Sequence, residues 1–383
     1  MKYRKFGSLD WEVSALGFGC MRLPTNDRRG MLTADVNEAE AVAMIRHAID
    51  SGVNYVDTAY TYHMGASEKV LGKALKGGYR DKVKLVTKSP TWALAAPGDY
   101  DRYLGEQLER LGEEHVDFYL FHALGTKRWQ IVKDVEAIAS AEAAVADGRI
   151  GHIGFSFHDD FDAFKTIVDG YDGWDLCLIQ HNYMDIESQA GTEGLRYAAS
   201  KGIACAIMEP LLGGSLANPP PSMHELFDGF EVRRTPADWA LQWLWDQPEV
   251  SVVLSGMSTM EQVDENLLSA DASGVGSLGP EGRSFIDRVS ERFRERAVIP
   301  CTGCGYCMPC PNDIEIPSFI RLYNEGVMYE DWYGPRFKYA RQFGEAKRAE
   351  ACLNCGECEE KCPQGVPVGE WMPKVHEALK WRD

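Results

Sequence analysis

The amino-acid sequence predicts an α/β fold: a (β/α)8 barrel followed by a small, mainly α-helical domain. Between about residues 14 and 270, short β-branched or apolar runs alternate with longer amphipathic stretches, eight of each. This alternation is typical of parallel β/α units, and the count over this length fits a closed barrel better than an open sheet. Beyond the barrel the composition changes, because eight of the eleven cysteines follow residue 300.

The elements follow in order along the chain. Residues 3–13 carry a Gly7-Ser8 turn and are predicted to form a hairpin that closes the bottom of the barrel. Strands are predicted over 15–19, 54–57, 83–87, 116–121, 150–156, 176–180, 204–208 and 250–254. Helices are predicted over 36–51, 67–76, 100–111, 132–147, 161–168, 192–200, 236–245 and 260–269. The Pro-rich stretch 218–222 is predicted to be a loop after the seventh strand.

A Gly-rich breaker at 273–282 and a charged helical segment at 283–296 separate the two parts of the chain. We therefore expect the barrel over 1–272, a linker and bridging helix over 273–296, and the cysteine-rich domain over 297–383. Helices are predicted in that last domain over 318–324 and 335–352.

The net charge of −18 argues against binding to nucleic acid or to anionic membranes. The N-terminal sequence MKYRKFGSLDWEV lacks the apolar run of a signal peptide, and no stretch reaches the length of a membrane span. We therefore expect a soluble, cytoplasmic protein. Cysteines in that compartment stay reduced, so a dense Cys-x-x-Cys array favours metal binding over disulfides.

The cysteines form two runs, Cys301-x2-Cys304-x2-Cys307-x2-Cys310-Pro311 and Cys352-x2-Cys355-x2-Cys358-x3-Cys362-Pro363. This is the bacterial ferredoxin pattern, in which the fourth cysteine of each run ligates the other cluster. It predicts one [4Fe–4S] cluster on Cys301, Cys304, Cys307 and Cys362, and a second on Cys352, Cys355, Cys358 and Cys310. Zinc is the alternative, although zinc sites usually use two separated pairs. The 41 residues between the runs are long for a compact ferredoxin, so we expect an α-helical ferredoxin-like domain.

Four chemically matched residues stand at the ends of predicted barrel strands, where such barrels carry their active sites. Asp57 ends the second strand, Tyr62 follows it, Lys88 follows the third, and His122 ends the fourth. A phenol keeps its proton at neutral pH, and a nearby ammonium makes that proton easier to release. A carboxylate holds the ammonium, and an imidazole orients a substrate oxygen. The four types suit the reduction of a carbonyl.

Seven segments carry a family resemblance: GFGCM (17–21), GVNYVDTAYTYHMGASEKVLGKAL (52–75), VTKSP (86–90), YLFH (119–122), IGHIGFS (150–156), EPLLGG (209–214) and TPADWALQWL (235–244). Through them the chain resembles the aldo-keto reductases over about residues 1–270. The resemblance implies a TIM barrel, a nicotinamide cofactor and a small-molecule carbonyl or alcohol substrate. It also implies that Asp57, Tyr62, Lys88 and His122 form the catalytic tetrad.

The resemblance further implies the cofactor contacts. Ser156 and Gln180 match carboxamide contacts, and Met208 stands where a tyrosine often stacks on the nicotinamide. Glu265 and Asn266 match adenine contacts, whereas Gly256 and Gln262 replace the usual phosphate-binding Lys and Arg. Both NADP(H) and NAD(H) therefore stay open, and the hydroxyls of Ser258 and Thr259 tip the expectation toward NADP(H). The other predicted contacts are Gly19, Cys20, Met21, Pro210, Leu211, Gly213 and Ser255. Trp92, Trp129 and Phe157 are expected near the mouth of the pocket.

Three functional hypotheses remain open. The first is an oxidoreductase with NAD(P)H in the barrel and the clusters as an electron store, relay or sensor, with or without a redox partner protein. The second is a ferredoxin-linked reductase that binds flavin or substrate directly in the barrel, since a flavin is the usual converter between two-electron and one-electron carriers. The third is a redox-sensing or docking module with structural clusters.

Overall fold

The computed structural model describes residues 1–27 and 33–381 of the chain. These residues form two compact units. The first comprises Met1–Leu212 and Ala237–Glu281, and the second comprises Gly213–Pro236 and Gly282–Asp383. The segment that follows the seventh barrel strand therefore groups with the cysteine-rich unit, although it is flanked by barrel elements in the sequence.

The first unit is a closed barrel of eight parallel strands, which confirms the predicted fold class. Each strand pairs with the next along the chain, and the last pairs with the first. The strands are β3 (Leu16–Gly19), β4 (Tyr55–Asp57), β5 (Lys84–Ser89), β6 (Val116–Leu124), β7 (Ile150–Phe157), β8 (Leu176–Gln180), β9 (Ala204–Met208) and β10 (Val252–Ser255). Apolar residues such as Val86, Leu120, Leu178 and Ala206 form one buried cluster with the strands' other inward positions.

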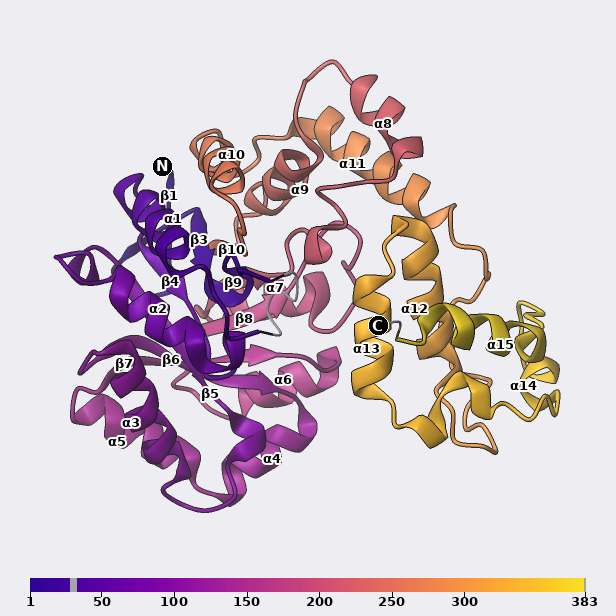
Figure 1. Ribbon diagram of the computed structural model, residues 1–383, viewed down its shortest axis with the longest axis horizontal. Coiled ribbons are helices and arrows are strands. Elements are labelled where there is room, and N and C mark those ends of the chain that lie inside the picture. The colour runs from indigo at the N-terminus through magenta and orange to yellow at the C-terminus, as the bar shows by residue number, and fades with distance from the viewer. Residues whose placement is uncertain (28–32, 382–383) are drawn as a thin grey trace. The chain divides into compact units, whose positions relative to one another are not determined.

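Helices surround this barrel (Figure 1) and cover its outer face with a second, larger apolar cluster. They are α1 (Glu38–Asp50), α2 (Ala66–Ala74), α3 (Asp99–Leu111), α4 (Thr126–Asp134), α5 (Ala137–Ala146), α6 (Phe161–Asp169), α7 (Gly191–Ser200), α9 (Pro236–Trp245) and α10 (Met260–Asp271). The prediction of one helix over 132–147 is wrong, because the chain turns at Glu136, whose φ is 54°. Val135 and Ala137 are both buried there, and residues two apart cannot share one helix face.

An antiparallel hairpin of β1 (Tyr3–Lys5) and β2 (Glu12–Ser14) precedes the barrel, as predicted. Phe6, in its turn, packs its ring 5.2 Å from that of Phe118 and 5.9 Å from that of Tyr55. Both partners lie near the starts of their strands, so the hairpin closes the N-terminal end of the barrel. The C-terminal end of the strands is left for the functional site.

In its described residues the second unit consists of helices joined by loops and contains no strand. It contains α8 (Pro221–Asp228), α11 (Gly279–Arg294, mostly in this unit), α12 (Ile316–Tyr329), α13 (Tyr333–Gln342), α14 (Glu357–Glu360) and α15 (Val368–Leu379). Helices α12, α13 and α15 pack around Phe319, Tyr339 and Met372. The helix predicted over 335–352 ends early, at Gln342, because the chain becomes extended at Phe343.

The prediction of a loop over 218–222 is also incorrect at its end, because Pro221 begins α8. Proline is well tolerated in the first turn of a helix, where its missing N–H has no partner to lose. The helix is held by tertiary contact, since Phe227 lies 5.8 Å from Phe285 of α11. Among the residues that the structure describes, no helix has both the length and the apolar character needed to cross a membrane.

Candidate functional site

The register of three neighbouring strands brings the four predicted catalytic residues together at the C-terminal end of the barrel. Asp57 pairs with Val86 across β4 and β5, two residues before Lys88. The Lys88 ammonium donates to Asp57 Oδ1 at 2.5 Å, to the Thr58 carbonyl at 2.7 Å and to Tyr62 Oη at 3.4 Å. The ring of His122 lies 6.0 Å from that of Tyr62. Lys88 thus connects the carboxylate to the phenol.

The four side chains lie in two layers. Asp57 and Lys88 are buried, with 3% and 0% of their surfaces exposed, whereas Tyr62 and His122 are half-buried. A substrate can therefore reach the phenol and the imidazole but not the ion pair. This arrangement suits proton transfer by the accessible Tyr62, whose pKa is influenced by the buried charges of Lys88 and Asp57.

Tyr62 is held by an unusual turn. It opens a short helical turn (Tyr62–Gly65) in which His63 and Met64 adopt left-handed φ values of 50° and 53°. The buried His63 ring accepts the Leu23 backbone N–H at 3.2 Å and contacts the Thr33 carbonyl at 3.2 Å. Because His63 fixes this turn to the loop after β3, it positions the preceding phenol.

A buried polar network supports Lys88 from the outer side of the barrel. Gln107 on α3 donates to the Lys88 carbonyl at 3.2 Å and to Thr87 Oγ1 at 2.8 Å, and it accepts from Tyr119 Oη at 2.6 Å. Its amide also donates to Glu68 Oε1 at 2.5 Å. This network was not among the expectations from the sequence. A Gln on the apolar face of the predicted helix was the available signal.

Burial and charge set the protonation states. Burial raises the pKa of Tyr62, and this effect outweighs the lowering by Lys88. Burial also raises the pKa of Asp57 against the opposing pull of Lys88. For Lys88, burial lowers the pKa, but Asp57 and Tyr62 together outweigh it and the pKa is raised. Burial and the Lys88 charge put the pKa of His122 well below 6.5. At neutral pH we therefore assign a phenol, an ammonium–carboxylate pair and a neutral imidazole.

Two buried polar atoms of the tetrad lack a hydrogen-bond partner among the described residues: Asp57 Oδ2 and His122 Nδ1. Buried polar atoms are nearly always hydrogen-bonded, so an exception calls for an explanation. The other ring nitrogen of the half-buried His122, Nε2, is not among these buried atoms and is chemically suited to a polar group of a bound substrate or cofactor. The residues present therefore fit a ligand of that kind.

The first three predicted nicotinamide contacts lie at the C-terminal ends of β7, β8 and β9. Ser156 Oγ accepts from the Ala123 backbone N–H at 2.7 Å, one residue beyond His122. Gln180 donates to Asp185 at 2.7 Å and accepts from Gln189 at 3.0 Å. Met208 is half-buried at the end of β9 and packs against the apolar cluster of the barrel interior. Pro210 is buried, Leu211 is partly buried, and Gly213 lies in the second unit.

The predicted phosphate-binding loop follows β10 and is internally hydrogen-bonded. Asn266 donates to Ser255 Oγ at 2.9 Å, and the Ser258 backbone N–H donates to Gln262 Oε1 at 2.8 Å. Glu265 is exposed. The neighbouring loop after β3 begins at Gly19, where an added Cβ would lie 3.2 Å from the Ser255 carbonyl.

That neighbouring loop continues through Cys20, Met21 and Arg22 (Cys20–Arg22, a single helical turn). The Cys20 thiol is buried, and burial together with the Asp57 charge raises its pKa. Met21 is half-buried. Arg22 lies beside Gly256, and the sequence analysis did not select it.

Two of the three aromatic residues expected at the mouth lie elsewhere. Trp129 and Phe157 are buried in the apolar cluster between the strands and the outer helices, so that expectation is wrong for them. Trp92 is 42% exposed, and its ring lies 5.1 Å from that of His122. The Arg128 guanidinium lies 5.4 Å from the Trp92 ring. Trp92 alone of the three borders the tetrad.

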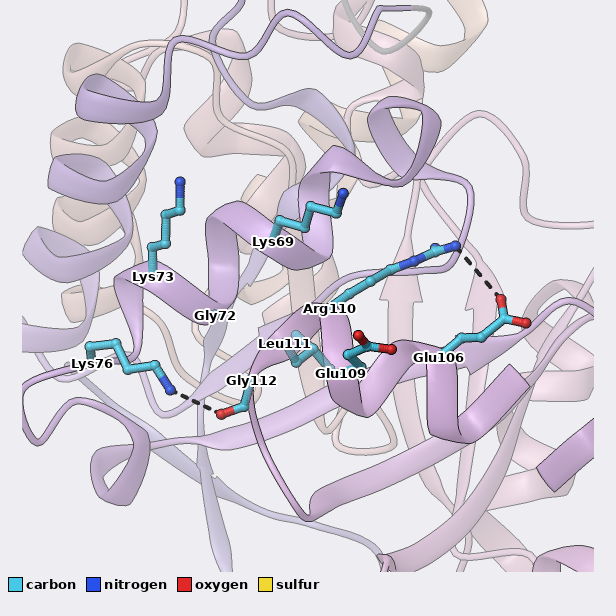
Figure 2. Close-up of a pocket in the computed structure, with 9 residues that line it drawn as sticks. All are labelled: Lys69, Gly72, Lys73, Lys76, Glu106, Glu109, Arg110, Leu111 and Gly112. Atoms are coloured by element: carbon cyan, nitrogen blue, oxygen red, sulfur yellow. Dashed lines mark hydrogen bonds and ion pairs between the residues drawn. The ribbon is translucent and has the colours of Figure 1, made fainter. Parts of the chain in front are cut away.

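The outer face of the barrel carries an open groove of about 530 Å³ between α2 and α3 (Figure 2). Its lining residues are Lys69, Gly72, Lys73, Lys76, Glu106, Glu109, Arg110, Leu111 and Gly112. Figure 2 marks a hydrogen bond from Lys76 to the Gly112 carbonyl and an ion pair between Arg110 and Glu106. The hydrogen bond measures 2.9 Å, and the ion pair measures 3.8 Å. The groove holds none of the tetrad residues, so it is not the place of the predicted reaction.

In the second unit, the four cysteines predicted to share the first cluster line one cavity. Cys301, Cys304, Cys307 and Cys362 lie there with apolar residues such as Ile316 and Val368. Burial raises the pKa of the Cys307 thiol, and the other three cysteines act on it in the same direction. The Gly303 backbone N–H donates to Cys301 Sγ at 3.4 Å, a type of bond that tunes cluster potentials.

The second predicted set is grouped less tightly. Burial raises the pKa of Cys358 to about 11, and Glu359, Cys352 and Cys355 add to the effect. Cys310 belongs to the preceding run, but the nearby Asn312 side chain donates to the carbonyl of Ala351, next to Cys352. Cys310, Cys352 and Cys358 also pack against the same apolar cluster.

Within the described parts of the chain, no three His, Cys, Asp or Glu side chains converge closely enough to hold a single metal ion. A cubane cluster is bound through four separate irons, so its cysteines surround a larger body than one ion. The grouping of the first four cysteines around one cavity fits such a body. The chemistry of four thiols with adjacent backbone N–H groups fits it as well.

Comparison with known proteins agrees with both parts of the chain. The model for the aldo/keto reductase family matches residues 15–273, and that for a 4Fe-4S dicluster domain matches residues 300–367. L-galactose dehydrogenase of Arabidopsis thaliana is 27% identical over 311 residues, which cover 76% of this chain and 95% of that protein.

Two solved structures share the barrel. An aldo-keto reductase from Bacillus halodurans in its holo form matches with a TM-score of 0.61 and 25% identity, over 76% of this chain and 96% of that one. An aldo/keto reductase from Klebsiella pneumoniae in complex with NADP and acetate matches with a TM-score of 0.59 and 25% identity, over 76% and 95%. The protein is therefore an oxidoreductase that belongs to the aldo/keto reductase family and carries a C-terminal 4Fe-4S dicluster domain.

Proposed function

We propose that the protein reduces a small-molecule carbonyl with NADP(H), and oxidises the matching alcohol in reverse, with Tyr62 as the general acid and base. The observation that carries this proposal is the position of the Lys88 ammonium, which bonds Asp57 and Tyr62 at once. No other buried cation described in the barrel touches a phenol that is open to a substrate. A carbonyl oxygen needs a proton donor of this kind when hydride arrives at its carbon.

The side chains divide the work. A nicotinamide bound in the barrel would supply the hydride. Tyr62 donates its proton to the developing alkoxide, and Lys88 stabilises the phenolate that is left. Asp57 holds Lys88 in place by an ion pair. Because this pair is buried away from solvent, the attraction between the two charges is little screened. His122, neutral at this pH, donates a ring N–H to the same substrate oxygen and orients it.

NADP(H) is the proposed cofactor for two reasons. The related Klebsiella pneumoniae enzyme is in complex with NADP. The loop after β10 also offers the Thr259 hydroxyl at the start of α10, and helix N-termini favour phosphate groups. The Ser258 hydroxyl, in contrast, donates to the Arg22 carbonyl. Flavin finds no support in the comparisons and is not proposed.

The C-terminal cysteines are proposed to hold two [4Fe–4S] clusters. Cys301, Cys304, Cys307 and Cys362 would ligate one, and Cys310, Cys352, Cys355 and Cys358 the other. Hydride transfer moves two electrons and a cubane moves one. We therefore propose that the clusters serve as an electron store or relay for a redox partner protein rather than for the nicotinamide directly.

The barrel proposal is tested with anaerobically purified protein, NADPH and a panel of aldehydes and ketones. Replacing Tyr62 by Phe should lower carbonyl reduction by about 100-fold or more, because general acid catalysis is lost. Tyr60→Phe is the matched control, since that hydroxyl bonds Glu106 at 2.9 Å, away from the tetrad. Equal activity in the Tyr62→Phe and Tyr60→Phe variants would contradict the assigned role.

The cluster proposal is tested by iron and sulfide analysis and by visible absorption. We expect about eight irons per chain, as two [4Fe–4S] clusters require. Dithionite should bleach the absorption band, whereas NADPH alone should leave it unchanged. Rapid bleaching by NADPH in the absence of any partner would overturn the relay proposal and would leave the iron count unaffected.

A further inference from the structure

The barrel is closed by β3 and β10, and the loops that follow these two strands lie against each other. Ser255 pairs with Phe18 across the two strands, so both loops start at the same level. The Ser258 hydroxyl donates to the Arg22 carbonyl at 2.7 Å, which ties the first loop to the second. Residues far apart in the sequence thus form one surface.

Gly256 leaves room on this surface for the Arg22 side chain. A Cβ built on Gly256 would lie 3.1, 3.2 and 3.3 Å from Cδ, Cγ and Cβ of Arg22. The aliphatic part of Arg22 therefore lies over the Gly256 backbone, in the space that any other residue would fill. A larger residue at position 256 would have to displace the Arg22 side chain, whereas the backbone itself does not favour glycine, because the φ of Gly256 is not in the left-handed region.

The Arg22 side chain has an unusual electrostatic position. It is half-buried, and among the described residues its guanidinium has no ion pair and no hydrogen bond. Most of the other partly buried arginines of the barrel are bonded, such as Arg4, which donates to three backbone carbonyls, and Arg110, which pairs with Glu68. The Arg22 guanidinium is thus a cation whose hydrogen-bonding capacity is left for a ligand.

The neighbouring groups favour an anion. Helix α10 (Met260–Asp271) begins at the N-cap Thr259, whose side chain accepts from the Gln262 backbone N–H at 3.3 Å. A helix N-terminus carries partial positive charge and free N–H groups. The guanidinium adds a full charge and a planar fork of donors that matches a phosphate.

We propose that Arg22 binds the 2′-phosphate of NADP(H) and sets the preference of this protein for NADP(H) over NAD(H). Arg22 thereby supplies, from the loop after β3, the charge that Gly256 and Gln262 do not supply from the loop after β10. This inference rests on the proposed function, because it assumes that the barrel binds a nicotinamide cofactor. It adds a specificity-determining residue to that function.

The test measures dissociation constants for NADPH and NADH on the anaerobically purified full chain, by quenching of tryptophan fluorescence and by calorimetry. Wild-type protein should bind NADPH more tightly than NADH. Arg22→Ala should weaken NADPH binding by about 10- to 100-fold, the usual worth of a charge-assisted hydrogen bond, and should change NADH binding by less than about twofold. Arg22→Lys should keep part of the preference, and the exposed Arg196→Ala on α7 serves as the control.

A second variant tests the packing step. Gly256→Ala should displace the Arg22 side chain and weaken NADPH binding, but it should have no further effect when Arg22 is already Ala. Such non-additivity is the mark of two residues that act through one contact.

Four outcomes would overturn the inference. Equal weakening of NADPH and NADH in Arg22→Ala would place the guanidinium on the pyrophosphate that both cofactors share. An unchanged NADPH constant, or a wild-type preference for NADH, would remove the role altogether. If wild-type protein binds neither nucleotide, the proposed function itself fails, and this result is distinct from the other three.

Discussion

In the barrel, Asp57, Lys88 and His122 come from the ends of three neighbouring strands, whereas in the second unit seven of the eight clustered cysteines lie in loops. The exception, Cys358, lies in the four-residue α14. Lys88 is joined to Asp57 by a hydrogen bond of 2.5 Å and to Tyr62 by one of 3.4 Å. The cysteines are joined by no such network, and their neighbours are apolar residues and backbone N–H groups. The barrel side chains are therefore held by one another, whereas the cysteine loops fit a site that metal completes.

The two parts should therefore respond differently to substitutions. In the barrel, a substitution in the tetrad should lower the stability of the fold, because it leaves a charge buried without its partner. Lys88 and Asp57 are both buried and are bonded to each other. In the cysteine loops the cost falls on metal content. Four measurements, in order of expected effect, probe this difference.

Replacing Lys88 by Met should have the largest effect. It leaves the Asp57 carboxylate buried without its partner, which typically destabilises a protein by about 3–5 kcal/mol. Carbonyl reduction should fall by at least about 100-fold as well. Denaturant unfolding and the NADPH assay measure the two effects. Lys84→Met, on the same strand but 40% exposed, is the control and should cost less than about 1 kcal/mol. Equal losses in both variants would show that the tetrad is not pre-organised by its buried charge.

Replacing one cysteine in each run should remove iron and leave the barrel intact. Cys304→Ser and Cys355→Ser each remove one exposed thiol, and we expect each to lower the iron content by about half. Cys177→Ser, a buried barrel position, is the matched control and should keep all the iron. Iron analysis and thermal unfolding monitored on NADPH binding separate the units. Loss of NADPH binding together with iron would show that the two units do not behave independently.

The pH dependence of carbonyl reduction should follow Tyr62. Burial raises the pKa of this phenol above its ordinary value of about 10, so the reactive protonated form persists through neutral and mildly alkaline pH. Reduction should therefore stay level across this range and fall only as the pH rises through the Tyr62 pKa. Alcohol oxidation, which needs the phenolate, should rise over the same range. Because the pKa of His122 is far below 6.5, no loss is expected between pH 8 and about 6. A fall in reduction centred near pH 7 would contradict both assignments.

The smallest expected effect comes from Glu209, which directly follows β9. Its carboxylate is among the influences that raise the pKa of Tyr62. Glu209→Gln should therefore lower that pKa and move the alkaline limb to lower pH, by less than about one unit. The pH profile of reduction measures the shift, and Glu193→Gln, exposed on α7, serves as the control. An unshifted limb would mean that solvent screens this charge, and that the site is more open than the tetrad's burial indicates.

Much of this molecule follows from the sequence alone. The alternation of eight strands and eight helical stretches predicts the barrel, because a period of two and a period of 3.6 are local properties of the chain. Asp57, Lys88 and His122 could be placed together, since the carboxyl ends of parallel strands meet at one end of a barrel. The grouping of Cys301, Cys304 and Cys307 with the distant Cys362 was likewise available from spacing.

Tertiary structure decided the rest. The break at Glu136, the helix that begins at Pro221, and the burial of Trp129 and Phe157 depend on what each segment packs against, which no local pattern records. The same holds for Arg22, whose place beside Gly256 arises only because the first and last strands close the barrel. The raised pKa of Tyr62 is a further case, because burial is a sum over the whole surroundings. Periodicity and residue spacing are properties of the sequence itself. Desolvation of a side chain and contact between distant loops arise only when the chain has folded.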